Sequence, residues 1–429
     1  MPTKDINDCF QHDKDRLTHF EAIEILKSNI TPLKRAESVH LRKATGRVLT
    51  ATITAPRPIP AHRNAAVDGY AYNDKDYNPE QSTNLTVRAR IKAGDPVLNQ
   101  LETASAARIF TGAPMPTPLT SVAMQEDCKT EIKPDGTEIV TLPKGLKPNA
   151  NCRAAGEDTQ KGAPLIEAGT RLKPQHIAAL AAAGIHEITT NAPIKIACLS
   201  TGDELIDKPD EFAVGKVFDS NRPMLKALTQ QTTKNQANTA ITDLGILKDD
   251  PKIIEQTLIN AAQTHDVIIT SAGASKGEED HIINSLTKLG TRHLWQVAIK
   301  PGRPMSFGQI GDCLFIGLPG NPVAAFVCYL LYAHPLLCRL SGEPWPEPPR
   351  FSVPANFCVA SKKPDRREFL RGQLVIKDGE SWVEKYQKDG SGLITSLTRS
   401  NCLIELEESQ TSLKQGELVN VLPFSTWGL

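Results

Sequence analysis

The sequence predicts a multidomain protein of α/β and β domains, with a doubly wound, mostly parallel α/β domain at its centre. At 429 residues the chain exceeds what one hydrophobic core usually holds, so several domains are expected. From Ile194 to Leu340, short apolar runs alternate with helical patterns, which is typical of a parallel sheet covered by helices. On either side of this region, short β-branched runs separated by turns predict two smaller β-domains.

The composition is that of an ordinary soluble globular protein, with 40% hydrophobic and 23% charged residues. The 49 Lys and Arg residues balance the 49 Asp and Glu residues, which favours neither a nucleic-acid nor a membrane partner. Nine scattered cysteines form no CxxC pair, and the polar N-terminus lacks the apolar core of a signal peptide. We therefore expect a protein of the reducing cytoplasm.

The N-terminal part contains two predicted helices around a β-domain. Apolar residues recur at helical spacing in 17–30, where Thr18 can cap the helix and Glu21 lies three residues on. Alternating runs between Leu85 and Leu142 predict the small β-domain. A second helix is expected over 174–183, with a proline in its first turn and a glycine at its end.

From Ile194 the predicted elements alternate along the chain. In order, we expect a strand over 194–200, a helix near 222–231, a strand before Gly245, a helix near 251–263, a strand over 266–270, a helix near 279–289, strands over 297–299 and 313–318, and a helix from Asn321. The apolar run Val323–Leu337 contains His334 and Pro335 and is short for a membrane span, so we interpret it as a buried helix. The Pro-rich stretch 341–349 ends this domain, and 350–429 is predicted to be all-β.

Ligands of a doubly wound sheet bind at the carboxyl ends of its strands. Four loops are expected at that edge: Thr201–Leu205, Ser271–Asp280, Lys300–Pro304 and Pro319–Pro322. The 271–280 loop joins a strand to a helix through small residues, so its backbone N–H groups and the helix N-terminus can hold an anion. The edge also offers carboxylates (Asp203, Glu204, Asp280), cations (Lys276, Lys300, Arg303) and hydroxyls (Thr201, Ser271, Ser275). A site with both negative and positive side chains suits a phosphorylated substrate that binds together with Mg²⁺.

Each residue type at this edge also has a purely structural interpretation. The carboxylates could cap the next element, the two cations could be a solvated pair, and the prolines could only shape a turn. These alternatives stay open for single residues. The convergence of four separately predicted loops favours a binding site.

Eight motifs carry a family resemblance. They are AVDGYA (66–71), IFTGAPMP (109–116), RAAGED (153–158), STGDEL (200–205), TSAGASKGEED (270–280), IKPGRP (299–304), GLPGNP (317–322) and RREFLR (366–371). In this order and over nearly the whole chain, they resemble the MoeA/gephyrin E-domain family, the molybdopterin molybdenumtransferases.

The resemblance implies four domains. They are a discontinuous helical linker region (1–55 and 155–190), an inserted β-domain (56–154), an α/β molybdopterin-binding domain (191–341) and a C-terminal β-domain (350–429). It also implies a homodimer in which the inserted β-domain of one subunit completes the site of the other. Transient contacts with the molybdopterin adenylyltransferase and with acceptor molybdoenzymes are expected as well.

The implied reaction is molybdenum insertion. Molybdate reacts with adenylylated molybdopterin, Mg²⁺ assists, AMP leaves, and the metal ends on the pterin dithiolene. The absence of a Cys cluster agrees with this, because the substrate supplies the sulfur ligands.

Together, the loops and the resemblance assign the site residues. The catalytic set is Glu204, Asp249, Asp280, Lys300 and Asp68, of which Glu204, Asp249 and Asp280 are expected to bind the metal. The substrate-binding set is Thr201, Gly202, Ser271, Gly273, Ser275, Arg303, Pro319, Pro322, Thr111, Arg153, Asp158 and Ser391. Asp68, Thr111, Arg153 and Asp158 are the expected contribution of the facing subunit.

Five residues depart from the family pattern, namely Arg63, Ala65, Ala272, His281 and Gln296. They motivate two alternative functions: a scaffold paralogue with altered catalysis, and a molybdopterin adenylyltransferase.

Overall fold

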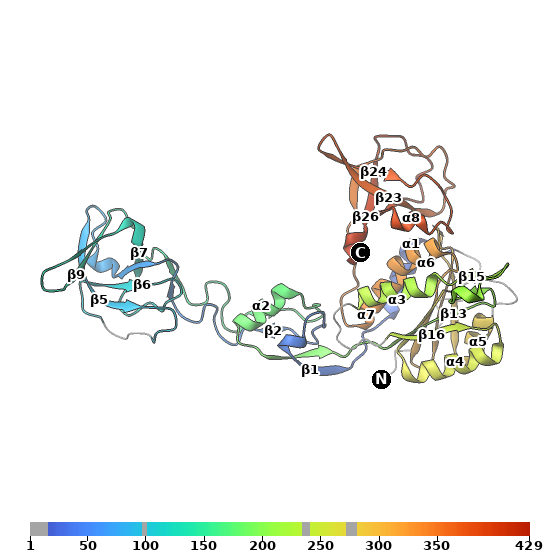
Figure 1. Cartoon of the computed structure of the whole chain (residues 1–429), viewed down its shortest axis with the longest axis horizontal. Coiled ribbons are helices and arrows are strands. Elements are labelled where there is room, and N and C mark those ends of the chain that lie inside the picture. Colours follow the sequence, from blue (N-terminus) through green and yellow to red (C-terminus); the bar gives the residue numbers. More distant parts are fainter. Residues whose placement is uncertain (1–15, 97–100, 234–240, 272–280) are drawn as a thin grey trace. The chain divides into compact units, whose positions relative to one another are not determined.

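The computed structural model describes residues 16–96, 101–233, 241–271 and 281–429. These residues form two compact units (Figure 1). The core unit comprises Met1–Ala51, Gly169–Lys173 and Glu187–Leu429, and the inserted unit comprises Thr52–Ala168 and Pro174–His186. The four-domain boundaries given above stay a prediction.

A six-stranded sheet forms the centre of the core unit. Its strand order is β16 (Ile241–Leu247), β13 (Ile196–Thr201), β17 (Val267–Thr270), β21 (Cys313–Gly317), β20 (Pro304–Ile310), β18 (Thr291–Gln296). The first four strands are parallel, and β20 and β18 are antiparallel to their neighbours. Val267, Ile268 and Ile269 are all fully buried, because helices cover both faces of the parallel part.

Helices lie on both faces of this sheet, as predicted (Figure 1). One face packs against α1 (His19–Asn29), α3 (Asn221–Thr232), α6 (Pro322–Cys328) and α7 (His334–Leu340), and the other against α4 (Pro251–Thr264) and α5 (His281–Leu289). Thr18 and Glu21 form the predicted capping box of α1. Asp250 caps α4 in the same way, by accepting from the N–H groups of Lys252 and Ile253.

The predicted strand over 297–299 is wrong. The structure has instead a two-residue strand, β19 (Ile299–Lys300), which pairs with β23 (Arg367–Lys377) of the C-terminal sheet. Strands β18 and β20 on either side of it supply the edge of the central sheet. The Lys300 loop therefore follows a strand of the neighbouring sheet, because long-range pairing overrides the local β pattern.

The apolar run after Asn321 is a core helix, as predicted. A π-helical turn (Tyr329–Ala333) joins α6 to α7, and the whole run Pro322–Leu340 is long and apolar enough to span a membrane. However, 89% of its most apolar window is buried within the protein. Packing against the sheet thus accounts for its composition.

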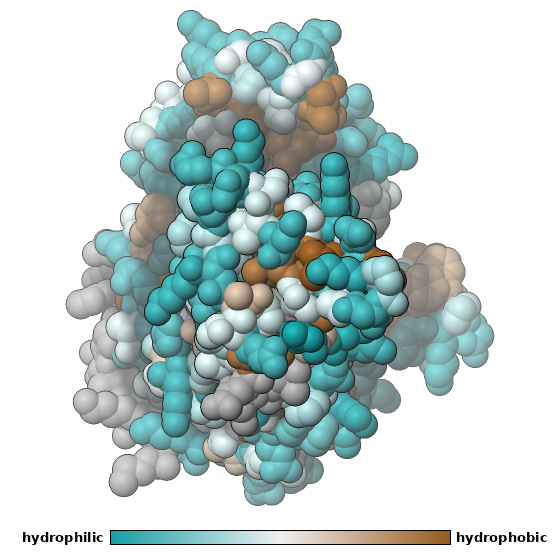
Figure 2. All heavy atoms as spheres, turned by 90° about the vertical axis from the view of Figure 1, so that its left-hand side faces the viewer, coloured by the Kyte–Doolittle hydropathy of each residue, from teal (hydrophilic) through white to brown (hydrophobic). Residues whose placement is uncertain are grey.

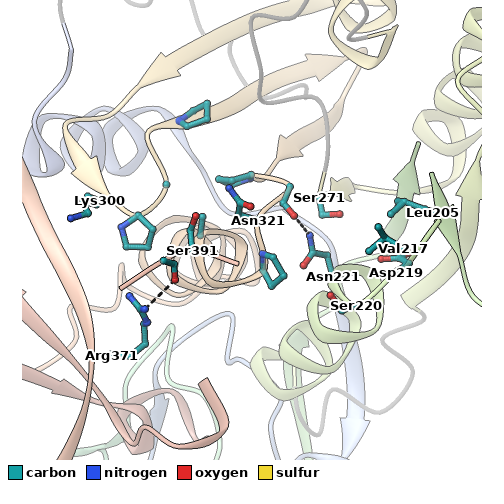
Figure 3. Close-up of a pocket in the computed structure, with 18 of the residues that line it drawn as sticks. Leu205, Val217, Asp219, Ser220, Asn221, Ser271, Lys300, Asn321, Arg371 and Ser391 are labelled. Carbon is teal, nitrogen blue, oxygen red and sulfur yellow. Dashed lines mark hydrogen bonds between the residues drawn. The ribbon is translucent and has the colours of Figure 1, made fainter. Parts of the chain in front are cut away.

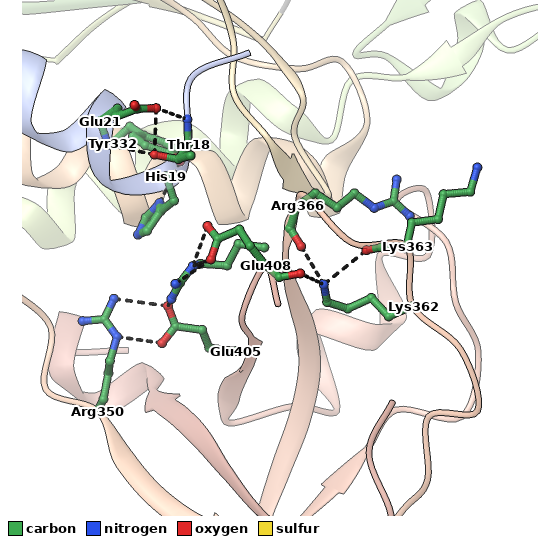
Figure 4. Close-up of polar contacts among 11 residues, drawn as sticks. Thr18, His19, Glu21, Tyr332, Arg350, Lys362, Lys363, Arg366, Glu405 and Glu408 are labelled. Atoms are coloured by element: carbon green, nitrogen blue, oxygen red, sulfur yellow. Dashed lines mark hydrogen bonds and ion pairs between the residues drawn. The ribbon is translucent and has the colours of Figure 1, made fainter. Parts of the chain in front are cut away.

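The C-terminal sheet runs β19, β23, β25 (Cys402–Leu406), β26 (Leu418–Pro423), β22 (Phe351–Pro354), with β24 (Glu380–Lys385) also paired to β23 and the short helix α8 (Thr395–Thr398) before β25. An ion network joins it to α1 (Figure 4). The buried Glu405 accepts from Arg350 at 2.6 Å and from Arg367 at 2.5 Å, and Arg367 lies over the ring of Phe20. The network thus fixes the C-terminal domain against the α/β domain.

The inserted unit contains a six-stranded sheet of its own, in agreement with the predicted β-domain. Its order is β7 (Ser121–Met124), β4 (Gly69–Tyr72), β6 (Ser105–Ile109), β5 (Thr83–Ile91), β9 (Glu138–Leu142), β8 (Lys129–Ile132). The same unit contains α2 (Pro174–Ala182) and the short pairs β2 (Ile53–Thr54) with β11 (Pro164–Ile166) and β3 (Asn64–Ala65) with β10 (Cys152–Arg153). The pair β1 (Ala36–His40) with β12 (Glu187–Asn191) belongs to the core unit.

Hydrophilic side chains cover most of the face shown in Figure 2, with small hydrophobic areas between them. This agrees with the soluble globular composition.

Candidate functional site

Four turns far apart in the sequence line one cavity of about 780 Å³ in the core unit (Figure 3). Thr201 ends β13, Ser271 follows β17, Pro319–Pro322 follows β21, and Lys300 comes from β19. The predicted convergence of these turns is therefore confirmed. The carboxyl ends of parallel strands bring three of them together, and the C-terminal sheet brings the fourth.

The turn after β13 places Glu204 at the cavity. Gly202 has a φ of +143°, and a Cβ atom there would lie 2.4 Å from a carboxylate oxygen of Glu204. The Gly202 N–H donates to the carbonyl of Leu247, and the Leu205 N–H donates to the carbonyl of Gly202. A glycine is thus required for this turn, while the Glu204 carboxylate stays exposed at the rim.

Asp249 lies beside this turn without lining the cavity. Its Oδ2 accepts from the N–H of Asp203 at 3.3 Å, and Oδ1 of Asp203 accepts from the N–H of Asp249 at 3.3 Å. Both side chains are exposed, and each keeps a second carboxylate oxygen outside this exchange. Glu204 belongs to the same turn, and carboxylate oxygens are the ligands that Mg²⁺ prefers, but these three described carboxylates are not close enough together to form a metal site by themselves.

The loop predicted to bind phosphate lies outside the described residues from 272 to 280. Gly273, Ser275 and Asp280 of the predicted site fall there, as do Ala272 and Lys276. Ser271, just before it, is 5% exposed and lines the cavity. Within the described ranges, no three His, Cys, Asp or Glu side chains are close enough together to hold a metal ion.

Lys300 is held by the C-terminal sheet. Its Nζ lies 3.3 Å from Oε2 of Glu368, whose side chain is 7% exposed and also pairs with Arg366 at 3.0 Å. Lys300 lines the cavity, whereas Arg303 is exposed and does not line it. Of the two cations of this loop, Lys300 is therefore the one at the cavity.

Ser391 reaches the cavity because Arg371 anchors its loop. Arg371 is 5% exposed and donates to the carbonyls of Gly390 at 3.1 Å and Lys388 at 3.4 Å. Figure 3 shows Arg371 beside Ser391. Burial lowers the pKa of Arg371. Arg371 is the last residue of the RREFLR motif, and its role depends on contacts that the sequence alone does not predict.

The start of α3 contributes a further group that the sequence analysis did not single out. Asn221 lines the cavity and donates from Nδ2 to the carbonyl of Gly320 at 2.6 Å. Asp219, also at the cavity, is fixed by Arg222 at 3.0 Å, and Arg222 pairs in addition with Asp207 and Asp243. The polar run Asp219–Arg222 before a predicted helix was the available signal.

Four predicted residues lie in the inserted unit. Oδ1 of Asp68 accepts from the N–H of Thr111 at 2.8 Å and from its hydroxyl at 2.7 Å, which lowers the pKa of Asp68. Arg153 and Asp158 are exposed on the segment that begins with β10. These four thus belong to a different unit from the residues that line the cavity.

Four of the five residues that depart from the family pattern lie within the described residues. Arg63 donates to the carbonyl of Thr120 at 2.7 Å, and Ala65 is fully buried in the core of the inserted unit. His281 begins α5, and Gln296 ends β18. Arg63 and Ala65 therefore support the fold of the inserted unit.

Three family models match the chain. They describe the MoeA N-terminal region (domain I and II) at residues 17–184, a probable molybdopterin binding domain at 197–339 and the MoeA C-terminal region (domain IV) at 359–424.

Many relatives match this chain, and two of them cover most of it as follows. A molybdopterin molybdenumtransferase from Haemophilus influenzae is 36% identical, over 91% of this chain and 94% of its own. Gephyrin from Dictyostelium discoideum is 29% identical, over 94% of this chain and 61% of its own.

A solved structure is also similar. The molybdopterin biosynthesis moeA protein from Pyrococcus horikoshii has a TM-score of 0.77 and 28% identity, with 95% of this chain and all of the other covered.

Proposed function

The chain belongs to the MoeA/gephyrin E-domain family of molybdopterin molybdenumtransferases, and we propose that it is the molybdenum insertase of molybdenum cofactor biosynthesis. It would transfer molybdate onto the dithiolene of adenylylated molybdopterin and release AMP, with Mg²⁺. The convergence of Thr201, Ser271, Lys300 and Pro319 on one cavity supports this proposal most. A cytoplasmic location agrees with the even charge balance and the scattered cysteines.

The proposed roles follow from the chemistry of the groups at the cavity. Lys300 is a cation fixed by Glu368, so it suits an oxyanion such as molybdate or phosphate. Ser271 and Ser391 supply hydroxyl groups, and both line the cavity. These groups would hold the pyrophosphate and the molybdate close together, which favours reaction between them.

Mg²⁺ would be held by Glu204, Asp249 and Asp280, with Asp203 beside them. When bound, it would neutralise charge on the phosphate oxygens as the bond to AMP breaks. The exposed carboxylates of Glu204, Asp203 and Asp249 are the part of this donor set that the described residues include.

We also propose that the protein is a homodimer whose inserted unit completes the cavity of the facing subunit. Asp68 and Thr111 support this idea, because the exposed Thr111 fixes the half-buried Asp68 carboxylate by two hydrogen bonds. A carboxylate held in place in this way is suited to meet a group from another molecule. Transient partners would be the adenylyltransferase that supplies the substrate and the acceptor molybdoenzymes.

The test is an insertion assay on the purified protein. Given molybdate, Mg²⁺ and adenylylated molybdopterin, it should release AMP and activate an apo-molybdoenzyme. Omission of Mg²⁺ should suppress both signals. The proposal fails if no AMP appears and the apo-enzyme stays inactive while a known insertase succeeds under the same conditions.

A further inference from the structure

An exposed apolar flap stands at one side of the cavity. It begins at β14 (Leu205–Ile206), passes through a 3₁₀ turn (Pro209–Glu211) and ends at β15 (Val217–Phe218), which pairs in parallel with β14. Phe212 is 65% exposed and Phe218 is 45% exposed. Large side chains of this kind are usually buried, so their exposure calls for a ligand.

The phenyl rings of Phe212 and Phe218 are stacked with nearly parallel planes. Their centroids are 5.7 Å apart and their planes differ by 3°. Phe218 and its neighbour Val217 line the same cavity as Lys300, Ser271 and Ser391. An apolar aromatic surface and an anion-binding surface are therefore parts of one site.

The base of the flap is fixed. The N–H of Val217 donates to the carbonyl of Glu204 at 2.8 Å, and the N–H of Asp219 donates to the carbonyl of Ile206 at 2.9 Å. The Asp219 carboxylate is in turn paired with Arg222. The ring of Phe218 thus stands next to a rigid residue of the cavity wall, which is what a preorganised contact needs.

We propose that Phe218, backed by Phe212, is a stacking platform for a planar nitrogen heterocycle whose phosphate group lies toward Ser271 and Lys300. Planar heterocycles stack well on aromatic side chains because each of them presents a flat π-face, whichever base it is. The inference rests on the proposed function, whose substrate has two such rings, adenine and pterin. It goes further in naming the surface that recognises one of them.

The size of the cavity favours a small molecule over a protein partner. Its volume of about 780 Å³ lies within the usual range of small-molecule sites. A second copy of this chain resting on the flap is the competing occupant, and the tests below separate the two.

Calorimetric titration of the full chain with three probes tests the platform: AMP, ribose 5-phosphate and 6-hydroxymethylpterin. Phe218→Leu keeps the apolar volume and removes the ring face. It should weaken binding of AMP or of the pterin by about tenfold or more, and leave ribose 5-phosphate unchanged. Loss with AMP assigns the platform to adenine, and loss with the pterin assigns it to the pterin ring. Phe218→Trp should restore binding.

Phe351→Leu is the matched control, because Phe351 is an exposed phenylalanine of the C-terminal sheet that does not line the cavity. The proposal is overturned if Phe218→Leu binds AMP and the pterin as the unchanged protein does, or if neither ring binds at all. It is also overturned if Phe218→Leu dissociates an oligomer in sedimentation, because the flap then covers a second copy. The insertion assay of the unchanged protein reports separately on the proposed function.

Discussion

Lys300 Nζ lies 3.3 Å from Oε2 of Glu368, although 68 residues separate them. Lys300 is at the cavity, and Glu368 is a buried carboxylate of the C-terminal sheet. The second oxygen of Glu368 pairs with Arg366. One carboxylate of the C-terminal domain thus orients a cation that lines the cavity.

Glu368→Gln should therefore lower insertion without unfolding the protein. Without the negative charge, Lys300 loses its fixed direction, and we expect kcat/KM for molybdate to fall by roughly tenfold or more. Glu384→Gln removes the partner of an exposed lysine on the same sheet and serves as the control. Steady-state kinetics measures kcat/KM for molybdate in both variants. Equal values of kcat/KM would refute the role of Glu368.

Arg371 should contribute to both stability and substrate affinity. Arg371→Met removes donors to Gly390, Lys388 and Ser396, so the free energy of unfolding should fall by about 2–4 kcal/mol. KM should rise, because the loop that holds Ser391 is released. Urea unfolding measures the first effect. Arg399→Met, at an exposed residue, should change stability by less than about 0.5 kcal/mol.

The parallel part of the central sheet could be predicted from the sequence because each strand is a short apolar run bounded by turn residues. The strand Val267–Thr270 and the loop after it are local features of this kind. Convergence of the loops followed, since parallel strands place their carboxyl ends at one edge. For this reason the sequence correctly predicts that Thr201, Ser271 and Pro319 line one cavity.

What the sequence analysis missed depends on contacts between distant segments. Ile299–Lys300 has a β pattern, but only its pairing with Arg367–Glu368 shows which sheet it joins. In the sequence, Arg371 looks like an ordinary strand residue. Its role follows only from its hydrogen bond to the carbonyl of Gly390, 19 residues away. Arg303 resembled Lys300 in charge and position, yet it is exposed away from the cavity.

Gly202→Ala should disturb the turn that places Glu204. A φ of +143° is strained for alanine, and its Cβ would collide with the Glu204 carboxylate. We expect a loss of about 1–3 kcal/mol in stability together with weaker dependence of activity on Mg²⁺. Gly392→Ala, where a Cβ meets no atom within 4 Å, is the control. Equal activity of the two variants over a Mg²⁺ titration would contradict the role of this turn.

His19 should make folding sensitive to mild acid. It is buried against Tyr332, and burial lowers the pKa of His19 to about 4 from its ordinary value. The unfolded chain binds the proton more readily, so stability is present near neutral pH and is lost as the pH falls from about 6.5 toward 4. The full effect is on the order of 3 kcal/mol. Urea unfolding at several pH values should show a shallower slope for His19→Gln over this window, and an unchanged slope would contradict the assignment.

The shared site gives the sharpest prediction. Asp68 and Glu204 lie in different units of the chain, and we propose that they meet across a dimer. Asp68→Asn and Glu204→Gln should each abolish insertion while they leave the melting temperature nearly unchanged, because Glu204 is exposed and the amide oxygen introduced by Asp68→Asn can still accept the hydrogen bonds from Thr111.

If the two variants are unfolded together and refolded as mixed dimers, one site in each mixed dimer regains both residues. Random pairing makes half of the dimers mixed, so about a quarter of the original activity should return. Asp68→Asn refolded with itself is the control and should stay inactive. A site built within a single subunit would instead give no recovery, because no subunit in the mixture then contains both carboxylates.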